Sequence, residues 1–156
     1  MVVEDEPDIY EVLLAMFEMW GIEGVAFVDG EEAVAWIDDV DSGRFKGELP
    51  ELALLDIRLP GEISGVMVSE RLRQSHVLGQ IAIVLTTANK PSIEDQEAYM
   101  IRAGADKWLP KPLPKFNELQ KVLESVIAQR RQGAAGAPVL PTKTPDDVRP
   151  QDLRNT

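Results

Sequence analysis

The sequence predicts an α/β fold, a doubly wound parallel sheet of five strands with five helices on its two faces. Three observations predict it. Short apolar segments alternate with segments whose apolar residues recur at helical spacing. The fourth apolar segment is β-branched and apolar throughout, which is typical of a strand covered by helices on both faces. The alternation continues without interruption to about residue 131, as in consecutive βαβ units.

The first two strands and helices are bounded by residues that commonly start or end such elements. A brief apolar run forms the strand at residues 1–3, and the helix expected at 7–21 ends at Gly21, a residue suited to a helix stop. A second strand is expected at 24–28. The helix at 29–40 opens with an Asp as N-cap and a Glu three residues later, which resembles a capping box.

The middle of the chain carries the third and fourth units. The strand at 51–56 is apolar until it ends on a lone carboxylate, and the segment 65–74 has a helical pattern. The strand at 81–87 precedes a helix at 92–104, which has a Ser/Asp capping pair at its start and Gly104 as its stop.

The last unit is a short strand at 107–110 and a helix at 115–131 with two Arg near its C-terminal end, where the helix dipole favours cations. Beyond it, Gly, Ala and Pro are frequent and no periodicity remains. We therefore expect one domain at 1–132 and a C-terminal tail at 133–156 that is flexible in isolation.

Composition excludes several classes of function. The chain has 156 residues, a net charge of −11 and no cysteine. Disulfide and thiolate chemistry are thus absent, and the negative charge argues against direct nucleic-acid binding and against docking on anionic membranes. No apolar stretch is long enough to span a membrane, and the acidic N-terminus does not resemble a signal peptide. We expect a cytoplasmic protein.

Acidic residues end two strands that the expected topology makes neighbours. The first strand ends at Glu4, Asp5 and Glu6, and the third ends at Asp56. For a five-stranded doubly wound sheet in the order 2-1-3-4-5, ligands are expected at the carboxyl ends of the first and third strands. Clustered carboxylates repel one another, and Mg²⁺, which prefers oxygen ligands, relieves that repulsion. A metal beside a carboxylate nucleophile suits phosphoryl transfer.

Two further strand ends supply groups that suit the same chemistry. Thr86 and Thr87 end the fourth strand, and a hydroxyl there could donate a hydrogen bond to phosphoryl oxygens. Lys111 follows the fifth strand and could neutralise the added charge. Each of these residues taken alone has an ordinary alternative, as a strand former or a loop residue, and their convergence is what favours a site.

With these elements the chain resembles the receiver domain of two-component response regulators, and in particular the chemotaxis regulator, a flavodoxin-like fold. The resemblance covers residues 1–130 and rests on "VVEDEP", "LLDIRLPG", "VLTTA" and "AGADKWLPKP". It implies that Asp56 is the phosphoacceptor and that Asp5 binds Mg²⁺ directly. It also implies that Glu4 acts through water and that the backbone carbonyl of Arg58 is a further metal ligand.

The resemblance also assigns the switch. Thr87 matches the switch hydroxyl, Lys111 matches the family lysine, and the Lys111–Pro112 bond is expected to be cis. Trp108 replaces the usual Tyr or Phe whose rotamer follows phosphorylation, and plain core packing is its alternative role. The loop "PGEISG" holds one residue more than the common "PGMDG" type, with Ser64 in place of the usual Asp.

The function implied is a stand-alone receiver that is not an enzyme acting on external substrates. A sensor histidine kinase or histidine phosphotransfer protein would phosphorylate it. The surface of the fourth helix, fifth strand and fifth helix would contact a downstream protein, with homodimer formation on phosphorylation as a further expectation. Alternatives are a phosphate-relay or sink receiver and a fragment of a larger regulator. A haloacid-dehalogenase-like phosphatase needs a second Asp where this chain has Arg58.

Overall fold

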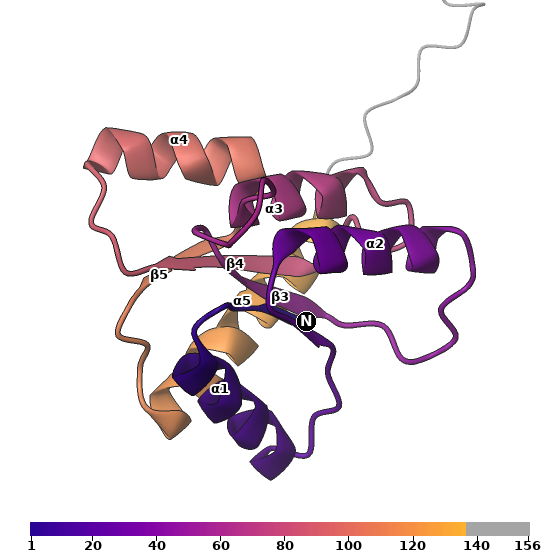
Figure 1. The fold of residues 1–156 in the computed structure, drawn as a ribbon, viewed down its shortest axis with the longest axis horizontal. Coiled ribbons are helices and arrows are strands. Elements are labelled where there is room, and N and C mark those ends of the chain that lie inside the picture. The colour runs from indigo at the N-terminus through magenta and orange to yellow at the C-terminus, as the bar shows by residue number, and fades with distance from the viewer. Residues whose placement is uncertain (137–156) are drawn as a thin grey trace, which may run out of the picture.

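The computed structural model describes residues 1–136, which form one parallel five-stranded sheet flanked by helices (Figure 1). The expected tail lies outside the described residues from position 137 onward. The strands are β1 (Val2–Val3), β2 (Ala26–Phe27), β3 (Leu52–Asp56), β4 (Ala82–Thr87) and β5 (Lys107–Pro110). The helices are α1 (Pro7–Met19), α2 (Gly30–Asp41), α3 (Gly65–Gln74), α4 (Ile93–Ala103) and α5 (Phe116–Gly136).

The strand order is β2-β1-β3-β4-β5, which confirms the predicted fold class and topology. β1 lies between β2 and β3, with Val2 opposite Ala26 of β2 on one side and Leu54 of β3 on the other. The sequence order of the strands reverses beside β1, so the carboxyl ends of β1 and β3 lie next to each other, where such folds bind their ligands.

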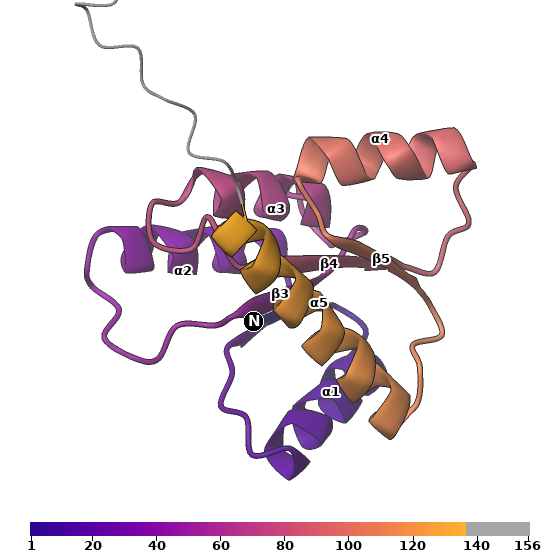
Figure 2. The same cartoon turned by 180° about the vertical axis from the view of Figure 1, so that it is seen from behind.

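The helices divide between the two faces of the sheet. α1 and α5 cover one face, and α2, α3 and α4 cover the other, as the two opposite views show (Figures 1 and 2). Alternate strand residues fill the two cores. Leu54 and Val84 pack toward α5 with Leu119, whereas Leu55 and Leu85 belong to the core on the opposite face.

Side-chain caps fix the starts of three helices, two of which, at Asp29 and Ser92, the sequence pattern predicts. Asp29 accepts a hydrogen bond from the Glu32 amide at 2.8 Å. Ser64 caps α3, and Ser92 caps α4. Gly104 ends α4 with a φ of +60°, a conformation that costs glycine little.

Two elements differ in length from the sequence-based expectation by more than two residues. β2 has two residues instead of five because β1, its partner among the described residues, offers just two for pairing. α5 continues to Gly136, four residues past the expected domain boundary at 132. The added residues include Ala134 and Ala135, and alanine has the highest helix propensity.

Gly65 brings the start of α3 against the end of β3. Its amide donates a hydrogen bond to the Ile57 carbonyl at 3.0 Å. A Cβ at this position would lie 1.9 Å from the carbonyl oxygen of Asp56. Only glycine fits, and the start of α3 is therefore held directly behind the residue that ends β3.

Candidate functional site

Lys111 joins the ends of three strands in one ion-pair cluster. It follows β5, and its Nζ lies 2.7 Å from Asp56 Oδ2 and 2.8 Å from Glu4 Oε1. All three side chains are buried, with exposed fractions of 6% for Lys111, 5% for Asp56 and 2% for Glu4. The fold therefore brings Glu4, Asp56 and Lys111 together, although 107 positions separate Glu4 from Lys111 in the sequence.

The acids outnumber the lysine at this cluster. Glu6 also contacts Lys111 Nζ, at 3.2 Å, from the exposed side. One carboxylate oxygen from each of Glu4, Asp5 and Asp56 lies within 4.8 Å of the others, with Asp5 exposed. Three oxygen donors at the mouth of a buried acidic cluster match the preferences of Mg²⁺. The residues present therefore fit a divalent cation on the solvent side of the cluster.

Burial perturbs the titration of the cluster. It raises the pKa of Glu4 to about 7, and the negative charge of Asp56 acts in the same direction, while the hydrogen bond from Lys111 only partly offsets both. Burial by itself would lower the pKa of Lys111. Its hydrogen bonds to Asp56 and Glu4 outweigh that effect and raise the pKa, so the lysine carries its charge.

Arg58 reaches the site with its backbone. Its amide donates a hydrogen bond to Asp56 Oδ1 at 3.1 Å, so each carboxylate oxygen of Asp56 has one donor. Its guanidinium faces Asn89 in the loop after β4. With the Asn89 amide oxygen oriented toward it, that oxygen accepts hydrogen bonds from Arg58 Nε at 2.6 Å and Nη2 at 2.8 Å.

The two threonines that end β4 lie in different environments. Thr86 pairs in register with Asp56, and its buried hydroxyl has no hydrogen-bond partner among the described residues. Thr87 accepts a hydrogen bond from the Asn89 amide at 3.3 Å. Because side chains alternate along a strand, Thr87 faces the same side of the sheet as Trp108, whose neighbour in register is Leu85.

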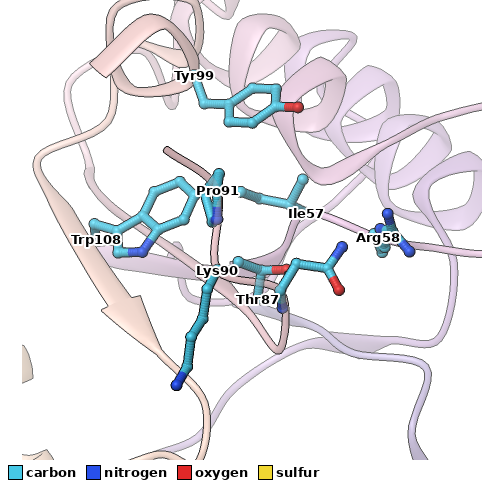
Figure 3. Close-up of a pocket in the computed structure, with 8 residues that line it drawn as sticks. Ile57, Arg58, Thr87, Lys90, Pro91, Tyr99 and Trp108 are labelled. Atoms are coloured by element: carbon cyan, nitrogen blue, oxygen red, sulfur yellow. The ribbon is translucent and has the colours of Figure 1, made fainter. Parts of the chain in front are cut away.

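A cavity of about 300 Å³ lies beside Thr87 (Figure 3). Trp108 and Tyr99 line it, with nearly parallel rings whose centroids are 6.4 Å apart. The rest of its walls is formed by Ile57, Arg58, Asn89, Lys90 and Pro91. The half-buried Trp108 thus has an open space next to it on the Thr87 side. The Lys111–Pro112 peptide bond, on the other side of the site, is cis.

Glu31 is the residue near the site that sequence reasoning missed. Its carboxylate accepts hydrogen bonds from the amides of Glu62 and Ile63 in the loop between β3 and α3. At the sequence level it is only one of several acids in the first turn of a helix, where acids are common. No signal in the sequence connects it to a loop about thirty positions away.

Comparison with known proteins identifies the family. The family model "Response regulator receiver domain" matches residues 1–124. The fold, the strand order and the acidic cluster at the switch point agree with that match. The chain belongs to the response regulator receiver domain family.

Curated relatives are regulators about twice as long. The chain is 31% identical to the phosphate regulon transcriptional regulatory protein PhoB of Pseudomonas aeruginosa, over 89% of this chain and 56% of that protein. It is 29% identical to the transcriptional regulatory protein CpxR of Escherichia coli K12, over 84% of this chain and 49% of that protein. The chain therefore spans about half the length of these relatives.

Solved structures show the same fold. A response regulator from Chloroflexus aurantiacus has a TM-score of 0.66 and 27% identity, over 81% of this chain and 94% of that one. The receiver domain of a Pseudomonas aeruginosa PAO1 sensor histidine kinase has a TM-score of 0.65 and 27% identity over the same shares, and its structure has a magnesium ion in the active-site cleft.

Within residues 1–136, no helix has the length and apolar character that crossing a membrane requires.

Proposed function

We propose that this domain is switched by phosphorylation of Asp56, with a histidine kinase or histidine phosphotransfer protein as the phosphoryl donor. The observation that carries the proposal is the buried Lys111 ammonium between Asp56 and Glu4, next to Asp5. In the transfer, an Asp56 carboxylate oxygen forms a bond to phosphorus while the bond between phosphorus and the donor's imidazole nitrogen breaks. Lys111 neutralises the charge that the phosphoryl group brings.

The proposed metal ligands are Asp5 and Asp56 directly, Glu4 through water, and the backbone carbonyl of Arg58. When bound, Mg²⁺ supplies positive charge that stabilises the phosphoryl oxygens during transfer. The protein's own contribution is to fix Asp56: Lys111 holds one carboxylate oxygen and the Arg58 amide holds the other. The carboxylate is thereby oriented before any donor arrives.

The proposed switch uses Thr87 and Trp108. Movement of the Thr87 hydroxyl toward a phosphoryl group on Asp56 would break its contact with Asn89 and enlarge the cavity beside it. Trp108 then turns into this space, which shifts the population between two packed arrangements. Its ring would leave Tyr99 on α4, so the surface formed by α4, β5 and α5 changes.

The proposed output is protein contact through that α4-β5-α5 surface, with a downstream protein or a second copy of the chain as partner, in the cytoplasm. The domain acts as a regulatory module, and it acts on no external substrate. Phosphate relay remains the second reading of the same site chemistry. A haloacid-dehalogenase-like phosphatase is disfavoured because Arg58 stands two residues after Asp56, where that class needs an acid.

The test of this proposal is phosphorylation with a small donor. Purified protein is incubated with acetyl phosphate and Mg²⁺, and the intact mass is measured. We expect the mass to increase by one phosphoryl group and Asp56→Asn to show no increase. Asp8→Asn, which alters an acid in the first turn of α1 outside the carboxylate cluster, serves as the matched control. Unchanged labelling of Asp56→Asn would overturn the assignment.

A further inference from the structure

Glu31 accepts hydrogen bonds from the loop between β3 and α3, which is about thirty positions away in the sequence. It is the second residue of α2, and its Oε1 accepts hydrogen bonds from the backbone amides of Glu62 at 2.8 Å and Ile63 at 3.2 Å. These hydrogen bonds, with that from Glu62 the largest contribution, lower the pKa of Glu31. The carboxylate is therefore a charged acceptor for two adjacent loop amides, a strong kind of hydrogen bond.

The loop is shaped to receive this carboxylate. Gly61 has a φ of +82°, and a Cβ there would lie 2.5 Å from Glu31 Oε1. Gly30, which begins α2, is equally close to the loop: a Cβ there would lie 2.5 Å from the Ile63 carbonyl oxygen. Two glycines, one on each side, thus allow the loop to pack directly against the first turn of α2.

This loop leads from the proposed phosphorylation site to α3. It starts at Ile57, directly after Asp56, and ends at Ser64, the N-cap of α3. Its second residue, Arg58, donates its amide to Asp56 and is a proposed metal ligand through its carbonyl. The far end is fixed by the hydrogen bond from Gly65 to Ile57. Between these ends, Ile63 packs against the core, and Glu31 is the side chain among the described residues that accepts hydrogen bonds from the amides of Glu62 and Ile63.

We propose that Glu31 is a positioning residue for the metal and phosphorylation site, and that it acts by fixing the loop of residues 57–64. The proposal rests on the proposed function, since it concerns the same site. Ordering a flexible loop when a metal binds costs conformational entropy. The two hydrogen bonds to Glu31 hold the loop in place before the metal binds, so binding does not have to order it.

The chain offers a matched control for the charge of Glu31. Glu32 is the next residue of the same helical turn and is also an exposed acid, but its carboxylate makes no hydrogen bond or ion pair among the described residues. Glu32→Ala and Glu31→Gln each remove one negative charge near the site. Glu31→Gln additionally keeps an oxygen that can accept from the loop amides, whereas Glu31→Ala removes both the charge and the acceptor.

The experiment measures Mg²⁺ affinity by calorimetry and amide hydrogen exchange in the loop for the wild type and the variants Glu31→Ala, Glu31→Gln, Glu32→Ala and Gly61→Ala. In Glu31→Ala we expect the Kd for Mg²⁺ to rise about tenfold, the lower end of the usual effect of losing an outer-shell partner. Glu31→Gln and Glu32→Ala should remain close to the wild type. The Glu62 and Ile63 amides should exchange faster in Glu31→Ala than in the wild type, Glu31→Gln or Glu32→Ala. Gly61→Ala, which strains the loop backbone at its positive φ and crowds the same carboxylate, should weaken Mg²⁺ binding as well.

Each result decides the proposal. Equal Mg²⁺ affinity of Glu31→Ala and Glu32→Ala would overturn it, and so would a Glu31→Gln protein as weak as Glu31→Ala, because charge alone would then explain the loss. If Glu31→Ala does not fold, as judged by circular dichroism, Gly61→Ala takes its place, and Mg²⁺ binding by Gly61→Ala as tight as that of Glu32→Ala would overturn the proposal. A wild-type protein that binds no Mg²⁺ would overturn the proposed function itself. In that event, unchanged exchange at Glu62 and Ile63 in Glu31→Ala would show that Glu31 does not fix the loop either.

Discussion

Lys111 is buried among carboxylates, and an ion pair in such a place is costly to desolvate. Its charge is matched by Asp56 and Glu4 at hydrogen-bond distance, with Glu6 at the exposed edge. Because one cation faces several acids, the cluster retains excess negative charge at its solvent side, where Asp5 lies. That excess is what a divalent cation would neutralise.

The role of Asp5 can be tested by its removal. We expect Asp5→Ala to weaken Mg²⁺ binding at least about tenfold, or about 1.4 kcal/mol, because it removes a proposed direct ligand. In the absence of metal the same variant should melt at a higher temperature, because one repelling charge is lost. Calorimetry and thermal unfolding measure the two effects.

Asp8→Ala is the control for that experiment. Asp8 is also acidic and lies in the first turn of α1, outside the carboxylate cluster. Its removal should leave Mg²⁺ affinity nearly unchanged and should slightly destabilise α1, since acids near a helix N-terminus are favourable. Normal Mg²⁺ binding by Asp5→Ala would place the metal elsewhere.

Some residues of the site follow from the sequence and some do not. Asp56, Glu4 and Lys111 could be placed together because the topology brings their strand ends to one edge of the sheet. The different environments of Thr86 and Thr87 depend on strand register, which no local pattern specifies for two adjacent β-formers. The contact of Glu31 with the loop depends on how α2 packs against it, and this is a purely tertiary feature.

At the scale of elements, the residues that commonly start or stop a helix or strand are the best predictors of where the elements lie. The bounds of α3 and β5 agree with the segments predicted, and the Asp29 and Ser92 caps lie where the pattern indicates, whereas the Ser64 cap of α3 was not predicted. The errors occur where a neighbour or intrinsic propensity decides: β2 is shortened by its short partner, and α5 is extended by its alanines. Strand length in a sheet is set by pairing as much as by composition.

Trp108 provides a direct probe of the proposed movement between α4 and β5. In a Trp20→Phe, Trp36→Phe background it is the only indole. Beryllofluoride with Mg²⁺ mimics the phosphorylated aspartate, and we expect it to shift the emission maximum of Trp108 to the blue as the ring enters the cavity beside Thr87.

Thr87→Ala should reduce that shift, because the hydroxyl that moves toward the phosphoryl group is gone. Tyr99→Ala is a useful comparison, since it removes the ring that stacks on Trp108 without touching Thr87. A constant emission maximum while mass spectrometry shows Asp56 to be modified by acetyl phosphate would make Trp108 a packing residue. The signal would then leave the site by another route.

At the scale of the whole molecule, the site and the proposed output surface lie on different elements that β5 connects. α4 exposes Ile93 and Ile101, with 77% and 82% of their surface accessible. If this face binds a second copy after phosphorylation, light scattering should show the mass doubling with beryllofluoride and Mg²⁺. Ile101→Ser should prevent the doubling, because it removes apolar surface from the interface.

Met19→Ser is the control for the dimer experiment, since Met19 is 75% exposed but lies at the end of α1, on a different part of the molecule. It should leave the mass change intact. A Lys111→Ala protein that accepts the phosphoryl group from acetyl phosphate should stay monomeric, because the lysine transmits the change. If the protein stays monomeric under all conditions, the exposed face of α4 does not mediate dimer formation, and a different protein becomes its expected partner.

The contact between Gly65 and Asp56 has a consequence for how this chain can vary. The backbone before residue 57 and after residue 64 is fixed by that contact, so any change in the number of residues between them must be absorbed by the loop alone. An insertion there alters the loop outline without shifting the register of α3 or the place of Asp56. In evolutionary terms, the two ends are closed to length variation and the interval between them is open, which makes it a suitable position for building selectivity between otherwise similar domains.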